Sequence, residues 1–188
     1  MVSTKPKALL VFLLLALFVL QGVYLVNRAS TTNDESFHVK AGGLYFQTGQ
    51  FGGGFHNPPM LQTVLGLPDG VGWAPYDILK ARPPYWSRYI NLLLGTLTAF
   101  AVFLVACRFF GENCGLLSLA MYALSPSLTA HSALATTDIG VTLWLFIFVA
   151  LVAASDKNDA PSSFVVAGLA LGAAIACKLT AMAFIGLM

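Results

Sequence analysis

Residues 8–26 read ALLVFLLLALFVLQGVYLV, an unbroken apolar run that follows Lys5 and Lys7. A helix rises about 1.5 Å per residue, so this run just covers a hydrocarbon core of about 30 Å. A cleaved signal peptide is the competing interpretation. The run is long for such a segment, however, and residues 27–30 (Asn-Arg-Ala-Ser) form a poor small-residue cleavage site. We therefore predict an uncleaved membrane span.

Composition supports a membrane protein throughout. The chain is 57% hydrophobic and 10% charged, whereas a soluble domain carries about 25% charged residues. Its net charge is +2, and its basic residues are scattered between apolar runs, which excludes a nucleic-acid-binding stripe. The expected fold class is an all-α integral membrane protein, a multi-span helical bundle.

The other apolar runs give the expected organisation. After the first span, further spans are predicted over residues 89–106, 115–126, 139–154 and 163–177, and a sixth begins at 179–188. Ten residues cannot cross a bilayer, so we expect the chain to be the N-terminal part of a longer transmembrane domain.

Residues 27–88 form a polar and aromatic loop between the first two spans. Within it we predict two short helices lying on the membrane surface. The first would be capped by Asn33 or Asp34. The second would begin at Pro58-Pro59 and end before Pro68. Aromatic residues of this loop, which suit the headgroup level of a membrane, are Trp73, Tyr76, Tyr85 and Trp86.

Basic residues near the predicted spans indicate the orientation. If the spans alternate, one side of the membrane receives Lys5, Lys7, Arg108 and Lys157. The positive-inside rule makes that side cytoplasmic. The long loop, the segment 127–138 and Lys178 then share the outer face, which brings Asp34, Glu35 and Asp138 to one side.

The acidic pair Asp34-Glu35 is the first candidate for chemistry. One interpretation is helix capping with a favourable dipole position for Glu35. The other is a general base, because neighbouring carboxylates near lipid should have raised pKa values. His38 lies one helical turn after Asp34 and could orient it by a hydrogen bond.

Each of the other residues predicted at the outer face has two interpretations, one structural and one functional. Asp138, after Thr136-Thr137, either sits in the first turn of a capped helix or binds a sugar hydroxyl or a divalent ion. Lys178 and Arg88 either snorkel to the interface or bind a lipid phosphate. His56 is either part of a proline-stiffened turn or a donor to phosphate or sugar. No nucleophile elbow, HExxH or cysteine–histidine cluster occurs.

Taken in order, these landmarks resemble the GT-C glycosyltransferase superfamily, and within it the dolichyl-phosphate-mannose–protein mannosyltransferase and aminoarabinose transferase-like branch. The matching elements are Asn33-Asp34-Glu35-Ser36-Phe37-His38, Gly42-Gly43-Leu44-Tyr45-Phe46, His56-Asn57-Pro58-Pro59-Met60, Arg88, Arg108-Phe109-Phe110-Gly111, Leu124-Ser125-Pro126, Thr136-Thr137-Asp138, Gly172 and Lys178. Asn57 departs from the pattern, because some relatives place a lysine directly before the prolines.

The resemblance implies an inverting transferase whose donor is a polyprenyl-phosphate sugar and whose acceptor is a hydroxyl of a protein, lipid or glycan. Catalytic residues would be Asp34, Glu35 and Asp138, and donor-binding residues would be His38, His56, Arg88 and Lys178. No cofactor is certain; Mg²⁺ or Mn²⁺ would be held by Asp34 and Asp138.

The implied location is a bacterial cytoplasmic membrane with the site facing the periplasm, or the endoplasmic reticulum membrane in a eukaryote. Family members run several hundred residues longer, so this part alone would lack much of the cavity. Two other function classes stay open, a polytopic transporter and a non-catalytic membrane subunit. A transporter would be expected to carry ionisable residues in mid-span.

Overall fold

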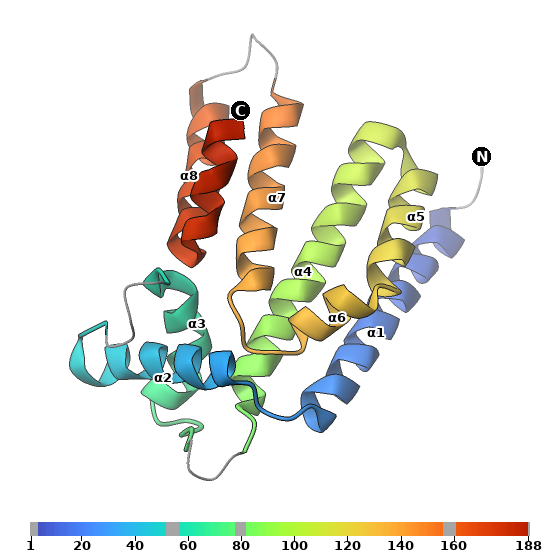
Figure 1. Ribbon diagram of the computed structural model, residues 1–188. Coiled ribbons are helices and arrows are strands. Elements are labelled where there is room, and N and C mark those ends of the chain that lie inside the picture. The colour runs from blue at the N-terminus through green and yellow to red at the C-terminus, as the bar shows by residue number, and fades with distance from the viewer. Residues whose placement is uncertain (1–3, 52–56, 78–81, 156–160, 188) are drawn as a thin grey trace.

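The computed structural model describes residues 4–51, 57–77, 82–155 and 161–187, and every regular element in these ranges is helical (Figure 1). The α-helices are α1 (Thr4–Arg28), α2 (Asn33–Thr48), α3 (Pro59–Gly70), α4 (Tyr85–Phe110), α5 (Glu112–Ala123), α6 (Pro126–Ser132), α7 (Asp138–Ala154) and α8 (Pro161–Cys177), and a 3-10 helix, η2, covers Leu179–Leu187. The all-α part of the fold prediction is confirmed.

Among the described residues, two helices are long and apolar enough to cross a membrane, Lys7–Arg28 within α1 and Tyr85–Phe110. Helices α7 and α8 have 17 residues each, a length of about 26 Å. Helix α5 has 12 residues, about 18 Å, so it is too short to cross the core by itself. Every predicted span corresponds to a helix, but within the described ranges only the first two have the length and hydropathy of a membrane span.

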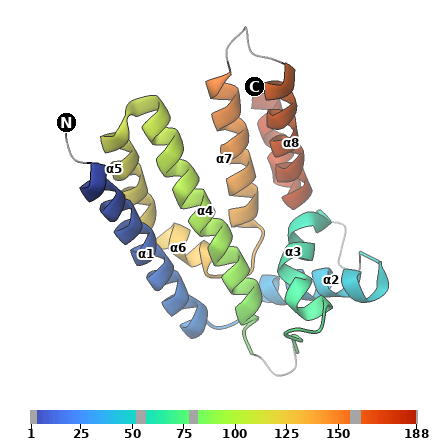
Figure 2. The ribbon, with the colours of Figure 1, turned by 180° about the vertical axis from the view of Figure 1, so that it is seen from behind.

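The long helices α1, α4, α7 and α8 run lengthwise, and α2 and α3 lie at one end of them (Figures 1 and 2). We call this the α2–α3 end; it also holds the start of α4, the start of α7 and the end of α8. At the opposite end Lys7 forms an ion pair with Glu112, with Nζ and Oε2 2.5 Å apart, and Arg108 lies in the last turn of α4. Lys157 lies outside the described residues.

Helix α2 begins with a capping box rather than with the predicted cap. Thr32 is the N-cap, its hydroxyl accepts from the backbone N–H of Glu35, and the Glu35 carboxylate accepts from the backbone N–H of Thr32. The prediction of Asn33 or Asp34 as the cap is therefore wrong, because a Thr-x-x-Glu pattern satisfies two free N–H groups at once. The helix ends at Gly49, whose φ of 72° is left-handed.

Helices α2 and α3 pack with their backbones almost touching. A Cβ on Gly42 would overlap the carbonyl oxygen of Gln62, and a Cβ on Gly66 would overlap the backbone of Gly42 and Gly43. Helix α3 runs to Gly70, past the predicted end before Pro68. That prediction is wrong; Pro68 lies in the last turn with its ring fully buried. The two helices thus form one tight unit that carries Asp34.

Two apolar clusters hold the helices together, and the first connects this unit to the long helices α7 and α8. One contains Val39 of α2, Leu65 of α3 and Ala135. The other joins α1, α4 and α5 around Phe18, which meets the Tyr122 ring edge-on at 5.3 Å. Large apolar side chains also point outward from α1, α4 and α8, including Leu20, Leu93, Leu97, Leu104, Val165 and Leu169. An outward apolar surface of this kind is typical of helices that contact lipid.

Candidate functional site

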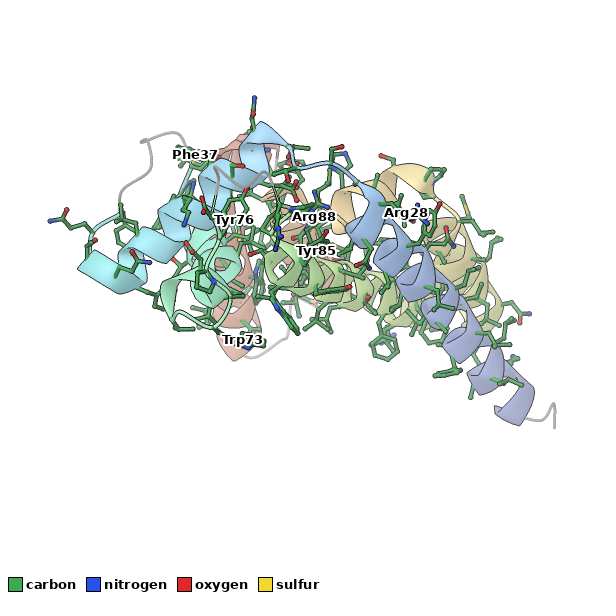
Figure 3. The ribbon with its side chains drawn as sticks, turned by 90° about the horizontal axis from the view of Figure 1, so that it is seen from below. Arg28, Phe37, Trp73, Tyr76, Tyr85 and Arg88 are labelled. Carbon is green, nitrogen blue, oxygen red and sulfur yellow. The ribbon has the colours of Figure 1, made fainter. Side chains whose placement is uncertain are left out.

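A buried ion pair, Glu35 with Arg88, joins α2 to the start of α4. Both side chains have 0% exposure, with Nε 2.6 Å from Oε1 and Nη2 2.8 Å from Oε2. The guanidinium also donates to three backbone carbonyls at 2.8 to 2.9 Å, those of Val26, Ala29 and Ser30. All five of its N–H groups are therefore engaged, and none remains for a phosphate. Figure 3 shows Arg88 between α1, α2 and α4.

The environment of Glu35 stabilises its charged form. Burial alone would raise the pKa of this carboxyl, but the hydrogen bond from Arg88 and those from the backbone N–H groups of Ala135 and Thr32 outweigh burial and hold the pKa below its ordinary value. The expectation of a raised pKa is therefore wrong for Glu35, because the sequence does not reveal these donors. The Glu35 carboxylate ties α2 to α4 and to the segment before α7, and through Arg88 the pair also holds the end of α1.

Asp34 and His38 lie on α2 beside this pair. Asp34 is exposed, while His38 is buried. The ring Nδ1 of His38 lies 3.3 Å from Nε2 of Gln62, so it accepts from the amide and pairs with Gln62 rather than with Asp34. Burial lowers the pKa of His38; the charges of Asp34 and Asp138 raise it and that of Lys178 lowers it. The imidazole is therefore neutral at pH 7 and lies within electrostatic reach of all three charged groups.

Asp138 begins α7 and pairs with Lys178, the residue between α8 and η2. Lys178 Nζ donates to Oδ1 at 2.6 Å, and Nδ1 of His131 lies 3.8 Å from Oδ2. The side chains of Asp138 and Lys178 are 41% and 32% exposed, so a ligand can reach both. Thr137 is the N-cap of α7 but makes no capping hydrogen bond with its side chain. Lys178 thus has a carboxylate partner, Asp138.

A second network, centred on Asp69, was not predicted. Asp69 is 4% exposed and binds Lys40 Nζ through both oxygens at 3.1 Å. It also accepts from the backbone N–H of Tyr76 at 2.7 Å, and the Tyr76 hydroxyl lies 2.8 Å from Ser36 Oγ. In the sequence, Asp69-Gly70 looks like an ordinary turn, because Lys40 is 29 residues away. The network fixes the loop after α3 against α2, two residues from Asp34.

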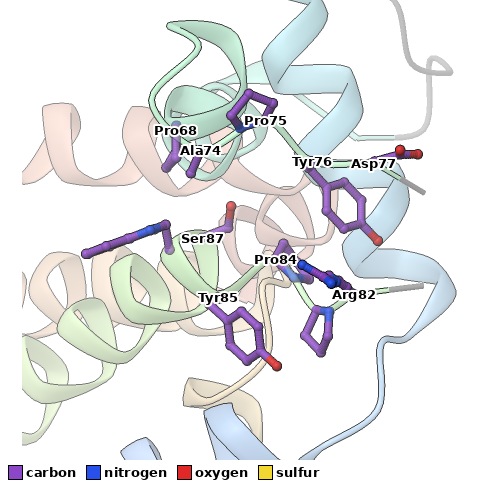
Figure 4. Close-up of a pocket in the computed structure, with 11 residues that line it drawn as sticks. Pro68, Ala74, Pro75, Tyr76, Asp77, Arg82, Pro84, Tyr85 and Ser87 are labelled. Atoms are coloured by element: carbon purple, nitrogen blue, oxygen red, sulfur yellow. The ribbon is translucent and has the colours of Figure 1, made fainter. Parts of the chain in front are cut away.

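That loop and the start of α4 enclose a pocket of about 330 Å³. It is lined by Pro68, Ala74, Pro75, Tyr76, Asp77, Arg82, Pro83, Pro84, Tyr85, Trp86 and Ser87. In Figure 4, Arg82 and Pro84 lie between the rings of Tyr76 and Tyr85. From the sequence, these aromatic residues suggested only a headgroup belt.

The remaining predictions concern His56 and a metal ion. His56 lies outside the described residues. Within the described ranges, no group of three or more histidine, cysteine, aspartate or glutamate side chains could hold a metal ion. What the described residues offer at the α2–α3 end is an exposed carboxylate, a neutral histidine and an accessible Asp138–Lys178 pair.

One comparison with known protein families identifies a transferase family. Neither the curated proteins nor the solved structures contain a match to the chain. Residues 86–187 match the family model described as dolichyl-phosphate-mannose-protein mannosyltransferase. This match begins in the first turn of α4 and includes Arg88, Asp138 and Lys178 but not Asp34 or His38. Since it covers more than half of the chain, the chain belongs to the dolichyl-phosphate-mannose-protein mannosyltransferase family of membrane glycosyltransferases.

Proposed function

We propose that the chain takes part in the transfer of a sugar from a polyprenyl-phosphate donor to an acceptor hydroxyl at the outer face of a membrane. One observation carries this proposal: His38 lies within electrostatic range of Asp34, Asp138 and Lys178 at the α2–α3 end, and Asp138 and Lys178 form an ion pair there. Family membership supports the reaction class and the donor. The convergence supplies a base and a cation at one place, which such a transfer requires.

The membrane arrangement that we propose is a multi-span helical bundle. Helices α1 and α4 would cross the bilayer fully, and α7 and α8, of 17 residues each, would cross with their ends near the interface. Lys7 and Arg108 would face the cytoplasm according to the positive-inside rule. Helices α2 and α3 would then lie at the outer interface, where the exposed Phe37 and Leu44 can contact lipid.

In the proposed reaction, the Asp34 carboxylate accepts the proton of the acceptor hydroxyl. The hydroxyl oxygen attacks C1 of the sugar from the face opposite the phosphate, and the bond between C1 and the phosphate oxygen breaks. The polyprenyl phosphate leaves with that electron pair, and the configuration at C1 inverts. Lys178 stabilises the charge on the leaving phosphate, since a fixed cation lowers the energy of developing negative charge.

The other predicted residues divide into two groups. Glu35 and Arg88 would position Asp34 without touching the donor, because their hydrogen bonds are already complete. Asp138 would hold Lys178 in place and contact a sugar hydroxyl. A phosphate contact of His56, and a divalent cation between Asp34 and Asp138, stay predictions.

The decisive experiment replaces Asp34 by asparagine in the full chain and measures transfer from a radiolabelled polyprenyl-phosphate sugar in membranes. General-base catalysis contributes about 10²- to 10⁴-fold, so Asp34→Asn should lower turnover by at least about a hundredfold. The matched control is Glu112→Gln, an exposed carboxylate at the opposite end, which should transfer at the wild-type rate. Unchanged turnover in Asp34→Asn would remove this residue from the base role.

A further inference from the structure

An open groove lies between α1 and α6, far from the α2 and α3 pair. It has a volume of about 470 Å³ and is lined by Leu20, Gln21, Tyr24, Leu25, Pro126 and Thr129. The side chains of Leu20 and Tyr24 are 67% and 63% exposed, so the groove opens outward. In Figures 1 and 2, α1 lies across the bundle from α2 and α3, and Figure 3 shows Arg28 on the same side as α1.

The groove lies at lipid depth in the proposed membrane arrangement. Arg28 is in the last turn of α1, the end that we place at the outer interface. Leu20 and Tyr24 come about 12 and 6 Å below it along the helix axis. Because residues four apart share one face of a helix, these three side chains form one row, and Gln21 and Leu25 form the row beside it. The groove thus spans the outer half of the hydrocarbon core, below a cation at headgroup level.

The polar groups of the groove wall are already used within the protein. The Thr129 hydroxyl donates to the carbonyl of Ser125 at 3.0 Å, and Nε2 of Gln21 donates to the carbonyl of Ala123 at 3.4 Å. Pro126 has no backbone N–H. A sugar or a polar peptide would leave its own hydrogen-bonding groups without partners here, which is costly. A hydrocarbon chain has no such requirement and gains from leaving water.

Arg28 is a cation without a counter-ion above this wall. Its side chain is exposed, its guanidinium carbon lies 5.8 Å from the centroid of the Tyr24 ring, and it forms no ion pair with any residue that the structure describes. A guanidinium that stacks on a ring keeps its N–H edge free for an anion, and two parallel N–H groups suit a phosphate. Since no described carboxylate pairs with Arg28, a headgroup that carries its own cation finds no partner there.

We propose that this groove binds an anionic phospholipid of the outer leaflet, with its phosphate on Arg28 and one acyl chain along Leu20, Leu25 and Pro126. The site has a free charge at headgroup level and an apolar wall below it, which is the polarity of a phospholipid from head to tail. A free phosphate would leave the wall uncovered, and an apolar helix would leave the charge of Arg28 unmatched. The inference depends on α1 crossing the membrane and not on the proposed reaction.

A lipid in the groove would join α1 to α6. Helix α6 has seven residues and is held to α4 by Asn91, which donates to the carbonyls of His131 and Leu134. The segment after α6 contains Ala135, whose N–H binds Glu35. A ligand that binds only the folded chain raises its stability, so the lipid should stabilise the protein and, with it, the position of this segment.

The test measures lipid binding to the delipidated full chain in detergent by native mass spectrometry. Phosphatidylglycerol is the anionic lipid, and phosphatidylcholine with the same acyl chains is the zwitterionic comparison. Arg28→Ala removes the cation and Tyr24→Ala removes part of the wall. Arg108→Ala is the matched control, because Arg108 is also an exposed arginine in the last turn of a long helix, α4, but lies at the opposite end. A phosphatidylglycerol with a photoreactive diazirine in its acyl chain locates the site by peptide mapping.

We expect the wild type to bind one phosphatidylglycerol about tenfold more tightly than phosphatidylcholine, as for a hydrogen-bonded pair with a charged group. Arg28→Ala should lose most of this preference. Tyr24→Ala should weaken both lipids, since the acyl chain of either contacts this wall. Phosphatidylglycerol should raise the Tm of the wild type and of Arg108→Ala, and raise it less in Arg28→Ala. The photolabel should concentrate on residues 20–25 and 126–129.

Equal affinities of the wild type for the two lipids, or an unchanged preference in Arg28→Ala, would overturn the inference. So would a photolabel spread evenly over the outward faces of α1, α4 and α8, which is the pattern of lipid that merely surrounds the protein. Displacement of the label by a polyprenyl phosphate at a lower concentration than unlabelled phosphatidylglycerol would also overturn it, because the groove would then bind the donor lipid. All these readouts are independent of sugar transfer, so the transferase proposal is tested separately by Asp34→Asn.

Discussion

Replacing Glu35 by glutamine tests whether the buried ion pair holds the α2–α3 end together. The glutamine keeps the size of the side chain but leaves Arg88 charged and buried without its counter-ion. Breaking a buried pair by removing one partner costs about 3–5 kcal/mol. A natural protein has about 5–15 kcal/mol of stability in all, so Glu35→Gln should remove a large share of it.

The matched control is Glu112→Gln, which breaks the ion pair with Lys7. There the side chains are 62% and 33% exposed, and exposed pairs contribute about 0–1 kcal/mol. The assay is thermal unfolding of the detergent-solubilised chain, followed by size-exclusion chromatography after heating. We expect a clear fall in Tm for Glu35→Gln and almost none for Glu112→Gln. Equal Tm values for the two variants would refute the structural role of the pair.

The pH dependence gives a second measure of the same pair. A carboxyl whose pKa is lowered in the folded chain adds stability above its unfolded value, and this contribution is lost as the pH falls through the folded pKa. The ordinary value of Glu35 is 4.5, so the Tm of the wild type should fall as the pH drops below about 4.5. The fall should be smaller in Glu35→Gln, which has no carboxyl to protonate at this position.

Two further predictions address packing and the histidine. Gly42→Val should separate α2 from α3, because the valine side chain would overlap the carbonyl of Gln62, and limited proteolysis should therefore cut the variant faster than the wild type. Gly168→Ala is the control, since a Cβ at this position meets nothing within 4 Å. Equal cleavage rates of the two variants would contradict the close packing. Burial lowers the pKa of His38 from 6.5, so the unfolded chain binds the proton more readily and stability should fall as the pH drops below about 6.5. His38→Gln should weaken that fall, measured as Tm against pH. A profile identical to that of the wild type would contradict the burial effect.

The helices could be predicted from the sequence because each long apolar run is a local signal. The predicted bounds for α4, 89–106, fall inside the observed Tyr85–Phe110, and those for α7 differ from the observed start by one residue. The wrong predictions concern helix ends, where a local capping or proline rule competes with another contact. Thr32 caps α2 because the Glu35 carboxylate also accepts a hydrogen bond from the backbone N–H of Thr32. Helix α3 continues through Pro68 to Gly70.

The candidate site was only partly accessible to sequence reasoning. The sequence pattern of a charged residue beside an apolar run is the same whether its side chain faces a ligand or pairs with a residue far away in the sequence. Arg88 was assigned to phosphate binding, but its carboxylate partner lies 53 residues earlier in the chain. For Lys178 the partner is Asp138, 40 residues away. Pairings at such separations depend on how the helices pack, which the sequence pattern alone does not specify.

The contacts of Arg88 also constrain the order in which the chain can assemble during synthesis. The carbonyls of Val26, Ala29 and Ser30 and the carboxylate of Glu35 all leave the ribosome before Arg88 does, and the N–H of Ala135 follows much later. Until α4 has been made, this region has no counter-ion and must remain hydrated. Glu35 therefore acquires its counter-ion only when the start of α4 is present, and it gains its last hydrogen bond when Ala135, in the segment before α7, arrives.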